Sequence, residues 1–177
     1  MASIFAHGFV SYALGKTFSN KITTSKFWIL GVFCSILPDA DVIGFTFGIS
    51  YDSFWGHRGF SHSILFAILI GILVSSIFYY KSVFTKTGVI LIFYFSICTA
   101  SHGILDAMTS GGLGIAFFSP FDTVRYFFPW RPIQVSPIGA SKFFSIWGIK
   151  VLLSELIWIA IPSSIYILAV ALLRKKK

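Results

Sequence analysis

The chain has 177 residues, of which 56% are hydrophobic and only 11% are charged, and its mean hydropathy is +0.85. A soluble domain of this length is far less apolar, so the composition excludes that class and indicates an integral membrane protein. The net charge of +8 would suit a nucleic-acid binder. However, the basic residues lie at the ends of apolar segments, which favours a membrane surface and no nucleic-acid partner.

Apolar runs predict about five membrane segments, over residues 4–18, 27–37, 64–80, 88–105 and 148–173. The first two are shorter than the roughly 20 residues that cross a hydrocarbon core. We expect the second to end at Pro38, where the chain leaves helical geometry. With no strand-like alternation, the prediction is an all-α helical bundle in which residues 1–177 form a single membrane-embedded domain. The first run lacks a cleavage signal, so we expect it to remain in the mature protein.

The basic residues predict how these segments are oriented. Nine flank one set of turns: Lys16, Lys21, Lys26, Lys81, Lys86, Arg174, Lys175, Lys176 and Lys177. Five lie on the other side: Arg58, Arg125, Arg131, Lys142 and Lys150. The positive-inside rule then predicts an outer N-terminus, five crossings of the membrane and a cytoplasmic C-terminus. All acidic residues and histidines fall at or near the outer side, although neither was used in the assignment, and this indicates a site there.

Two pairs of residues have spacings that suit metal binding. His102 and Asp106 are four residues apart, so on a helix they share a face and can bind one ion or two neighbouring ions. The alternative is a polar helix end at the headgroups. Asp39 and Asp41 follow Pro38, where two carboxylates can turn inward, and their alternative is a solvated turn with a helix cap.

Three further histidines precede or open apolar segments. Ser61 is expected to cap the helix that follows, which puts His57 in the loop and His62 in the first turn. Their five-residue separation means that one helical face cannot present both. His7 opens the first segment. The alternative is that these are ordinary surface or interfacial histidines.

Together these residues supply imidazoles and carboxylates without thiolates. The candidate metal ligands are His7, Asp39, Asp41, His57, His62, His102 and Asp106, and Asp41 is also a candidate general base. This donor set suits two or three divalent ions in a hydrolytic site, with zinc expected first and manganese or iron as alternatives. Bound cations would also offset the cost of placing carboxylates near lipid.

Four motifs carry a resemblance to a known family: Ala6-His7-Gly8, the Leu37 to Asp41 segment, the Gly56 to Ser63 segment, and the Ser101 to Asp106 segment. In this order they resemble the YdjM family of bacterial membrane-bound, predicted metal-dependent hydrolases, from about His7 to Trp130. More distantly, the pattern is similar to the zinc-dependent phospholipase C and single-strand nuclease superfamily. That similarity implies an all-helical fold with a phospholipase C-like arrangement of His and Asp around zinc.

Other polar residues have candidate roles beside the metal. Arg58 lies between the two histidines of its motif, where a guanidinium can hold a phosphate, whereas Arg125 and Arg131 are expected to anchor a loop at headgroups. Glu155 is the one acid inside an apolar crossing and is a candidate catalytic or supporting group. The alternative is pairing with a lysine or with a bundle hydroxyl such as that of Ser154. The aromatic stretch 109–147 is either a lid or an interfacial belt.

The leading hypothesis is a membrane-bound metal-dependent hydrolase that cleaves a phosphoester in a phospholipid or lipid-linked headgroup at the extracytoplasmic face. Asp41, Arg58 and Glu155 are its expected catalytic residues. One rival is a metal or proton-coupled transporter. Residues 8–15, 27–38, 64–80, 87–101 and 156–173 contain no Asp, Glu, His, Lys or Arg, which argues against a charged relay. Another rival is a non-catalytic scaffold stabilised by metal.

Overall fold

The computed structural model describes residues 1–175, apart from the side chains of residues 140 and 141, so Lys176 and Lys177 lie outside the described residues. The elements in chain order are α1 (Ile4–Gly15), α2 (Ser25–Ile36), η1 (Leu37–Phe47), η2 (Phe60–His62), α3 (Ile64–Phe78), α4 (Lys86–Ala107), α5 (Ala140–Phe143), α6 (Ile146–Glu155), η3 (Leu156–Ala160) and α7 (Ile161–Lys175). Over these residues there is no β-sheet, only two isolated bridges within the loop that follows α4. The all-α prediction is confirmed.

Three helical stretches are long and apolar enough to cross a membrane: Ser25–Phe47, Lys86–Ala107 and Ile146–Lys175. Helices α1 and α3 are equally apolar but shorter, with 12 and 15 residues. At a rise of about 1.5 Å per residue, each of the two is shorter than the hydrocarbon core. The structure therefore supports three spans, and five crossings remain a prediction.

The prediction that the second segment ends at Pro38 is wrong. Pro38 is in the first turn of η1, a 3-10 helix that continues directly from α2 and reaches Phe47. Proline is tolerated in a first turn because its missing N–H would have no helical partner there. The helical path thus extends to 23 residues and carries Asp39 and Asp41 on a rigid element.

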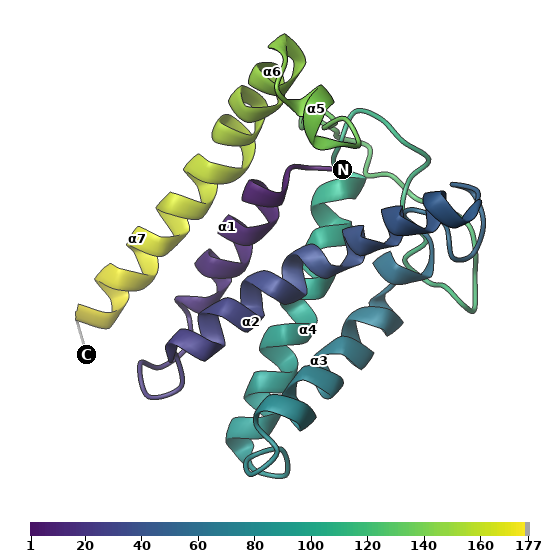
Figure 1. Cartoon of the computed structure of the whole chain (residues 1–177). Coiled ribbons are helices and arrows are strands. Elements are labelled where there is room, and N and C mark those ends of the chain that lie inside the picture. Colours follow the sequence, from purple (N-terminus) through teal and green to yellow (C-terminus); the bar gives the residue numbers. More distant parts are fainter. Residues whose placement is uncertain (176–177) are drawn as a thin grey trace.

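Helix α4 packs against α1, α2 and α3, and the long helix formed by α6, η3 and α7 lies beside α1 (Figure 1). In the core, the Phe27 and Tyr94 rings stack with centroids 4.0 Å apart. Close packing of α3 on α4 depends on Gly71, because a Cβ there would lie 2.6 Å from the Ile92 carbonyl oxygen. Small residues at such contacts let membrane helices approach closely. Helix α4 is therefore held by three neighbouring helices.

The two ends of the bundle differ in composition. The α1–α2 turn, the α3–α4 turn and the end of α7 lie at one end, and these carry the predicted cytoplasmic cations (Figure 1). The N-terminus and the loops after η1 and α4 lie at the other end. The histidines belong to this second end, because His7 is near the start of α1 and His102 is near the end of α4.

Thiol labelling tests the predicted orientation. A cysteine introduced at Ser53 should react with a membrane-impermeant reagent in intact cells, whereas one at Asn20 should react only after lysis, because the Ser25–Phe47 span separates them. The native Cys34 and Cys98 are buried and should stay unlabelled, which makes the parent protein the control. Labelling of Asn20→Cys but not Ser53→Cys in intact cells would reverse the assignment.

Candidate metal centre

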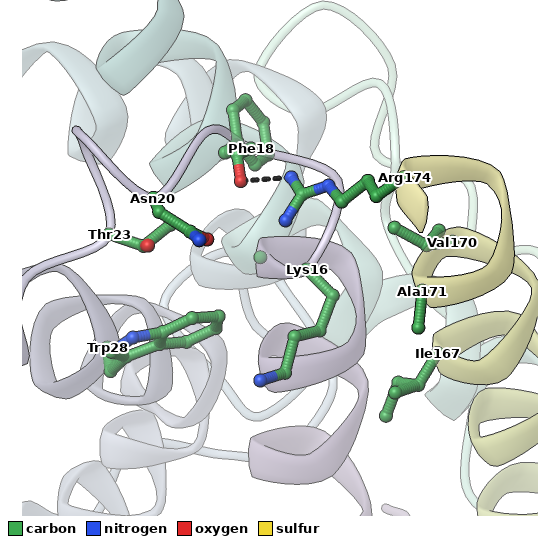
Figure 2. A pocket seen from close by; sticks show the side chains of 10 residues that line it. Lys16, Phe18, Asn20, Thr23, Trp28, Ile167, Val170, Ala171 and Arg174 are labelled. Atoms are coloured by element: carbon green, nitrogen blue, oxygen red, sulfur yellow. Dashed lines mark hydrogen bonds between the residues drawn. The ribbon is translucent and has the colours of Figure 1, made fainter. Parts of the chain in front are cut away.

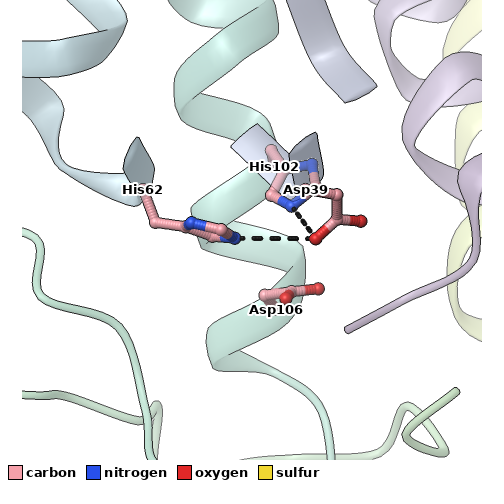
Figure 3. Close-up of side chains that lie close together, drawn as sticks. All are labelled: Asp39, His62, His102 and Asp106. Atoms are coloured by element: carbon pink, nitrogen blue, oxygen red, sulfur yellow. Dashed lines mark ion pairs between the residues drawn. The ribbon is translucent and has the colours of Figure 1, made fainter. Parts of the chain in front are cut away.

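Four predicted ligands converge from three separate elements. Asp39 comes from η1, His62 from η2, and His102 and Asp106 from successive turns of α4 (Figure 3). Each offers a ligand atom, and these atoms all lie within 4.8 Å of one another. His102 Nε2 lies 3.2 Å from Asp39 Oδ1, and His62 Nε2 lies 3.8 Å from the same oxygen. The two imidazoles therefore face one carboxylate oxygen across a small polar space.

The atoms that line this space are buried and have no hydrogen-bond partner among the described residues: Asp39 Oδ1, His62 Nε2, His102 Nε2 and Asp106 Oδ2. Buried polar groups are rarely left unpaired in folded proteins. The other ring nitrogen of His102, Nδ1, lies 2.7 Å from the Ser35 carbonyl oxygen. That carbonyl accepts a hydrogen bond from Nδ1–H, so the lone pair of Nε2 is available to coordinate a metal. The donor set and its unpaired atoms fit a divalent cation.

His7 adjoins this cluster from α1. Its ring stacks on the His102 ring at a centroid distance of 3.7 Å, and its Nε2 lies 3.5 Å from Asp106 Oδ1. Both of its ring nitrogens are buried without a hydrogen-bond partner in the described part of the chain. The Ala2 N–H donates to Asp106 Oδ1 at 2.6 Å. The first residues of the chain thus cover Asp106 and hold His7 beside it.

Asp41 and His57 form a second group that shares His62. Asp41 Oδ1 lies 2.7 Å from His57 Nδ1, and Asp41 Oδ2 lies 3.2 Å from His62 Nδ1. These three side chains also have the geometry of a metal-binding group. However, Asp41 Oδ2 already accepts a hydrogen bond from the Ser61 hydroxyl at 2.6 Å. Asp41 is therefore placed to orient both imidazoles, which is how carboxylates commonly support metal-binding histidines.

The prediction that Ser61 caps the following helix is wrong. The cap of α3 is Ser63, whose hydroxyl accepts the Phe66 N–H at 3.0 Å, whereas Ser61 binds Asp41. His62 accordingly lies in the short η2 turn before α3. The helix begins two residues later than predicted because the Ser61 hydroxyl is used by a carboxylate from a different segment.

The two histidines of this motif differ in protonation. Burial lowers the pKa of His57, and its contact with Asp41 only partly offsets that effect. Burial also disfavours the charged form of His62, but the neighbouring carboxylates of Asp39 and Asp41 outweigh that effect and raise the pKa of His62 to about 9. His57 is therefore neutral near pH 7, while metal-free His62 holds a proton that a bound cation would displace.

Arg58 is fully buried and has its guanidinium against Asp106. Its Nη2 lies 3.2 Å from Asp106 Oδ2 and donates to the Thr109 hydroxyl at 3.0 Å, and its Nη1 donates to the Gly111 carbonyl at 2.7 Å. Its backbone φ of 66° is unusual for a residue other than glycine. A Cβ at Gly112 would lie 2.3 Å from the Arg58 Nη1, so this glycine makes room for the guanidinium.

Glu155 pairs with a hydroxyl, as one of the predicted alternatives has it, but the hydroxyl is that of Ser3 and not that of Ser154. Its carboxylate accepts hydrogen bonds from both the N–H and the hydroxyl of Ser3, which is the N-cap of α1. Ser154 instead accepts the Gln134 N–H. Ser3 was missed by sequence reasoning because it lies 152 positions from Glu155. The same holds for Ser35, whose carbonyl orients His102 from within an apolar run.

The loop that follows α4 covers the centre. Thr109, Ile115 and Ile133 in this loop are buried, whereas Phe121 is 86% exposed. Arg125 donates to the His57 carbonyl at 2.9 Å and to the Tyr51 carbonyl at 3.0 Å. This arginine therefore joins the loops after η1 and α4. Arg131, in contrast, lies over the Phe127 ring at 4.6 Å.

Comparison with known proteins identifies the family of the chain. The model of the YdjM inner membrane protein family matches residues 1–177. Inner membrane protein YbcI of Escherichia coli (strain K12) is 34% identical over 163 residues, which cover 92% of each chain. No solved structure matches the chain significantly. From the full-length match and its apolar helices, the chain is a bacterial inner membrane protein that belongs to the YdjM family.

Proposed function

We propose that this protein is a metal-dependent hydrolase that cleaves a phosphoester in a phospholipid or lipid-linked headgroup. The observation that carries the proposal is the convergence of four buried ligand atoms on Asp39, His62, His102 and Asp106, which make no hydrogen bond among the described residues. His7 is an additional ligand from α1. Zinc is the first expectation, with manganese or iron as alternatives, because the donors are imidazoles and carboxylates without thiolates.

A divalent cation held there would supply Lewis-acid chemistry, polarising a phosphoryl oxygen and making water more acidic. The chain's own residues would complete the site. Asp41 orients His57, whose lowered pKa keeps it neutral and able to accept a proton from water. Arg58 fixes Asp106 and adds positive charge beside it. Glu155 would support the site through Ser3, which holds the start of α1 and thereby His7.

A lipid-borne substrate is supported by a cavity of about 440 Å³ next to Asp41. Asp41 and Ser61 form its polar part, and Ile43, Phe47 and Trp55 are among its apolar lining residues. Phe47 is 80% exposed and Trp55 is 64% exposed, as expected for side chains that contact lipid. A lipid headgroup bound at Asp41 would thus lie next to an apolar surface that can contact the acyl chains. We propose that this end of the bundle faces the extracytoplasmic leaflet.

The test uses purified protein in liposomes with phosphatidylglycerol, phosphatidylethanolamine and lipid-linked phosphates. Elemental analysis should find at least one divalent ion per chain, and headgroup release should stop on chelation and return with zinc or manganese. Metal flux measured in the same vesicles distinguishes the hydrolase from a transporter and from a non-catalytic scaffold. Flux without release would establish a transporter, and a metal-loaded protein with neither activity across the panel would favour the scaffold.

A further inference from the structure

A second cavity lies at the opposite end of the bundle from the metal centre. It has a volume of about 540 Å³ and lies between the α1–α2 turn and the last turns of α7 (Figure 2). This volume is in the range of small-molecule binding sites. The α7 side is held in place by a hydrogen bond between Thr17 and Tyr166 and by one from Arg174 to the Phe18 carbonyl.

Two cations line this cavity, and neither has an acidic partner among the described residues. The Lys16 ammonium lies over aromatic rings, 4.5 Å from the centroid of Tyr12 and 5.1 Å from that of Trp28. Arg174 reaches the cavity from α7 (Figure 2). The acids of the chain all belong to other regions: Asp39, Asp41, Asp52, Asp106, Asp122 and Glu155. The cavity therefore has uncompensated positive charge that favours an anion.

The cavity also has an apolar wall. Ile167, Val170 and Ala171 of α7 line it opposite Asn20 and Thr23 (Figure 2). Helix α7 has no buried residue, so its apolar side chains continue from this wall onto the surface that contacts lipid. A freely soluble anion would gain nothing from such a wall. An amphiphile with an anionic headgroup matches both halves of the cavity.

We propose that this cavity binds one anionic phospholipid. Its phosphate would lie between Lys16 and Arg174, its polar headgroup atoms near Asn20 and Thr23, and the start of its acyl chains along α7. Basic residues next to a membrane are each favourable partners for anionic lipids. The predicted orientation puts this lipid in the cytoplasmic leaflet. The site does not depend on the proposed hydrolase, because it lies at the other end of the bundle.

Native mass spectrometry of the full chain in detergent tests the proposal, with phosphatidylglycerol and phosphatidylcholine as probes. The protein should bind one phosphatidylglycerol at least about tenfold more tightly than phosphatidylcholine. The double variant Lys16→Gln/Arg174→Gln should bind phosphatidylglycerol at least about tenfold more weakly than the parent protein does. Val170→Trp, which fills the cavity without changing the charge, should lose binding to a similar extent.

The matched control is Lys81→Gln/Lys86→Gln, which removes the same charge from exposed residues of the α3–α4 turn at the same end. It should keep phosphatidylglycerol affinity within about twofold. An equal loss in this control, or no preference for phosphatidylglycerol over phosphatidylcholine, would overturn the proposal in favour of diffuse surface charge. Saturation by glycerol phosphate alone would also overturn it, because the occupant would then be a soluble anion. A single gel-filtration peak and an unchanged midpoint of thermal unfolding would show that each variant is folded.

Discussion

Asp39→Ala and His62→Ala are each expected to abolish both bound metal and headgroup release. Each substitution removes one of four ligand atoms that lie within 4.8 Å of one another, and Asp41, the other carboxylate of η1, already accepts a hydrogen bond from Ser61 and contacts His57. Loss of either ligand leaves the other buried donors without the geometry that a tightly held ion needs, so we expect the metal to be lost during purification. Elemental analysis and release from phosphatidylglycerol or lipid-linked phosphate vesicles provide the measurement, and both should fall to the background of empty vesicles.

The matched control for these variants is Asp52→Ala, which removes an exposed carboxylate from the loop after η1. It should retain metal and activity. Asp41→Asn is an informative intermediate, because Asp41 contacts the imidazoles rather than the Asp39 and Asp106 oxygens. Loss of such a supporting carboxylate typically weakens metal binding or activity by about 10- to 100-fold. Full metal retention with full activity in Asp39→Ala would refute the centre.

Arg58→Ala is expected to lower the free energy of unfolding by about 3–5 kcal/mol in metal-free protein, because it leaves a fully buried Asp106 without its cationic partner. The loss should shrink when metal is bound, since a divalent ion also compensates Asp106. The metal-loaded variant should also release headgroups about 10- to 100-fold more slowly, because Arg58 would no longer hold the ligand Asp106 in place. Denaturant titration in mild detergent, with and without metal, gives the stability values.

Two further variants separate the loss of the buried ion pair from the effect of backbone strain at Arg58 and from the loss of an arginine elsewhere. Arg58→Gly should be about 1 kcal/mol more stable than Arg58→Ala, because glycine adopts the φ of 66° without strain. Arg131→Ala removes a cation that lies over an aromatic ring outside the centre and should cost less than about 1 kcal/mol. If Arg58→Ala were as mild as Arg131→Ala in metal-free protein, the buried ion pair would not stabilise the fold.

Several features followed from the sequence because they depend on local chemistry. Long apolar runs can satisfy their backbone groups in lipid only as helices, so the all-α class followed from hydropathy. The spacing of His102 and Asp106 placed both on one face of a helix, and this is what α4 presents. The basic residues separated the two ends of the bundle. Each of these inferences uses residues that are close together in the chain.

Other features required the tertiary structure, because they depend on contacts between distant segments. The sequence predicted both Asp39 and Asp41 as ligands, with Asp41 also a candidate general base. In the structure Asp39 faces His102, while Asp41 binds Ser61 and His57 from another loop. Packing also explains why the helical path continues past Pro38. A proline in the first turn of a helical segment is compatible with a continued helix or with a turn, and contacts with other segments decide between the two. Hydropathy and spacing specify which elements form and which residues they present. Only the packing of those elements decides which unpaired atoms meet, because that depends on the geometry of the whole bundle.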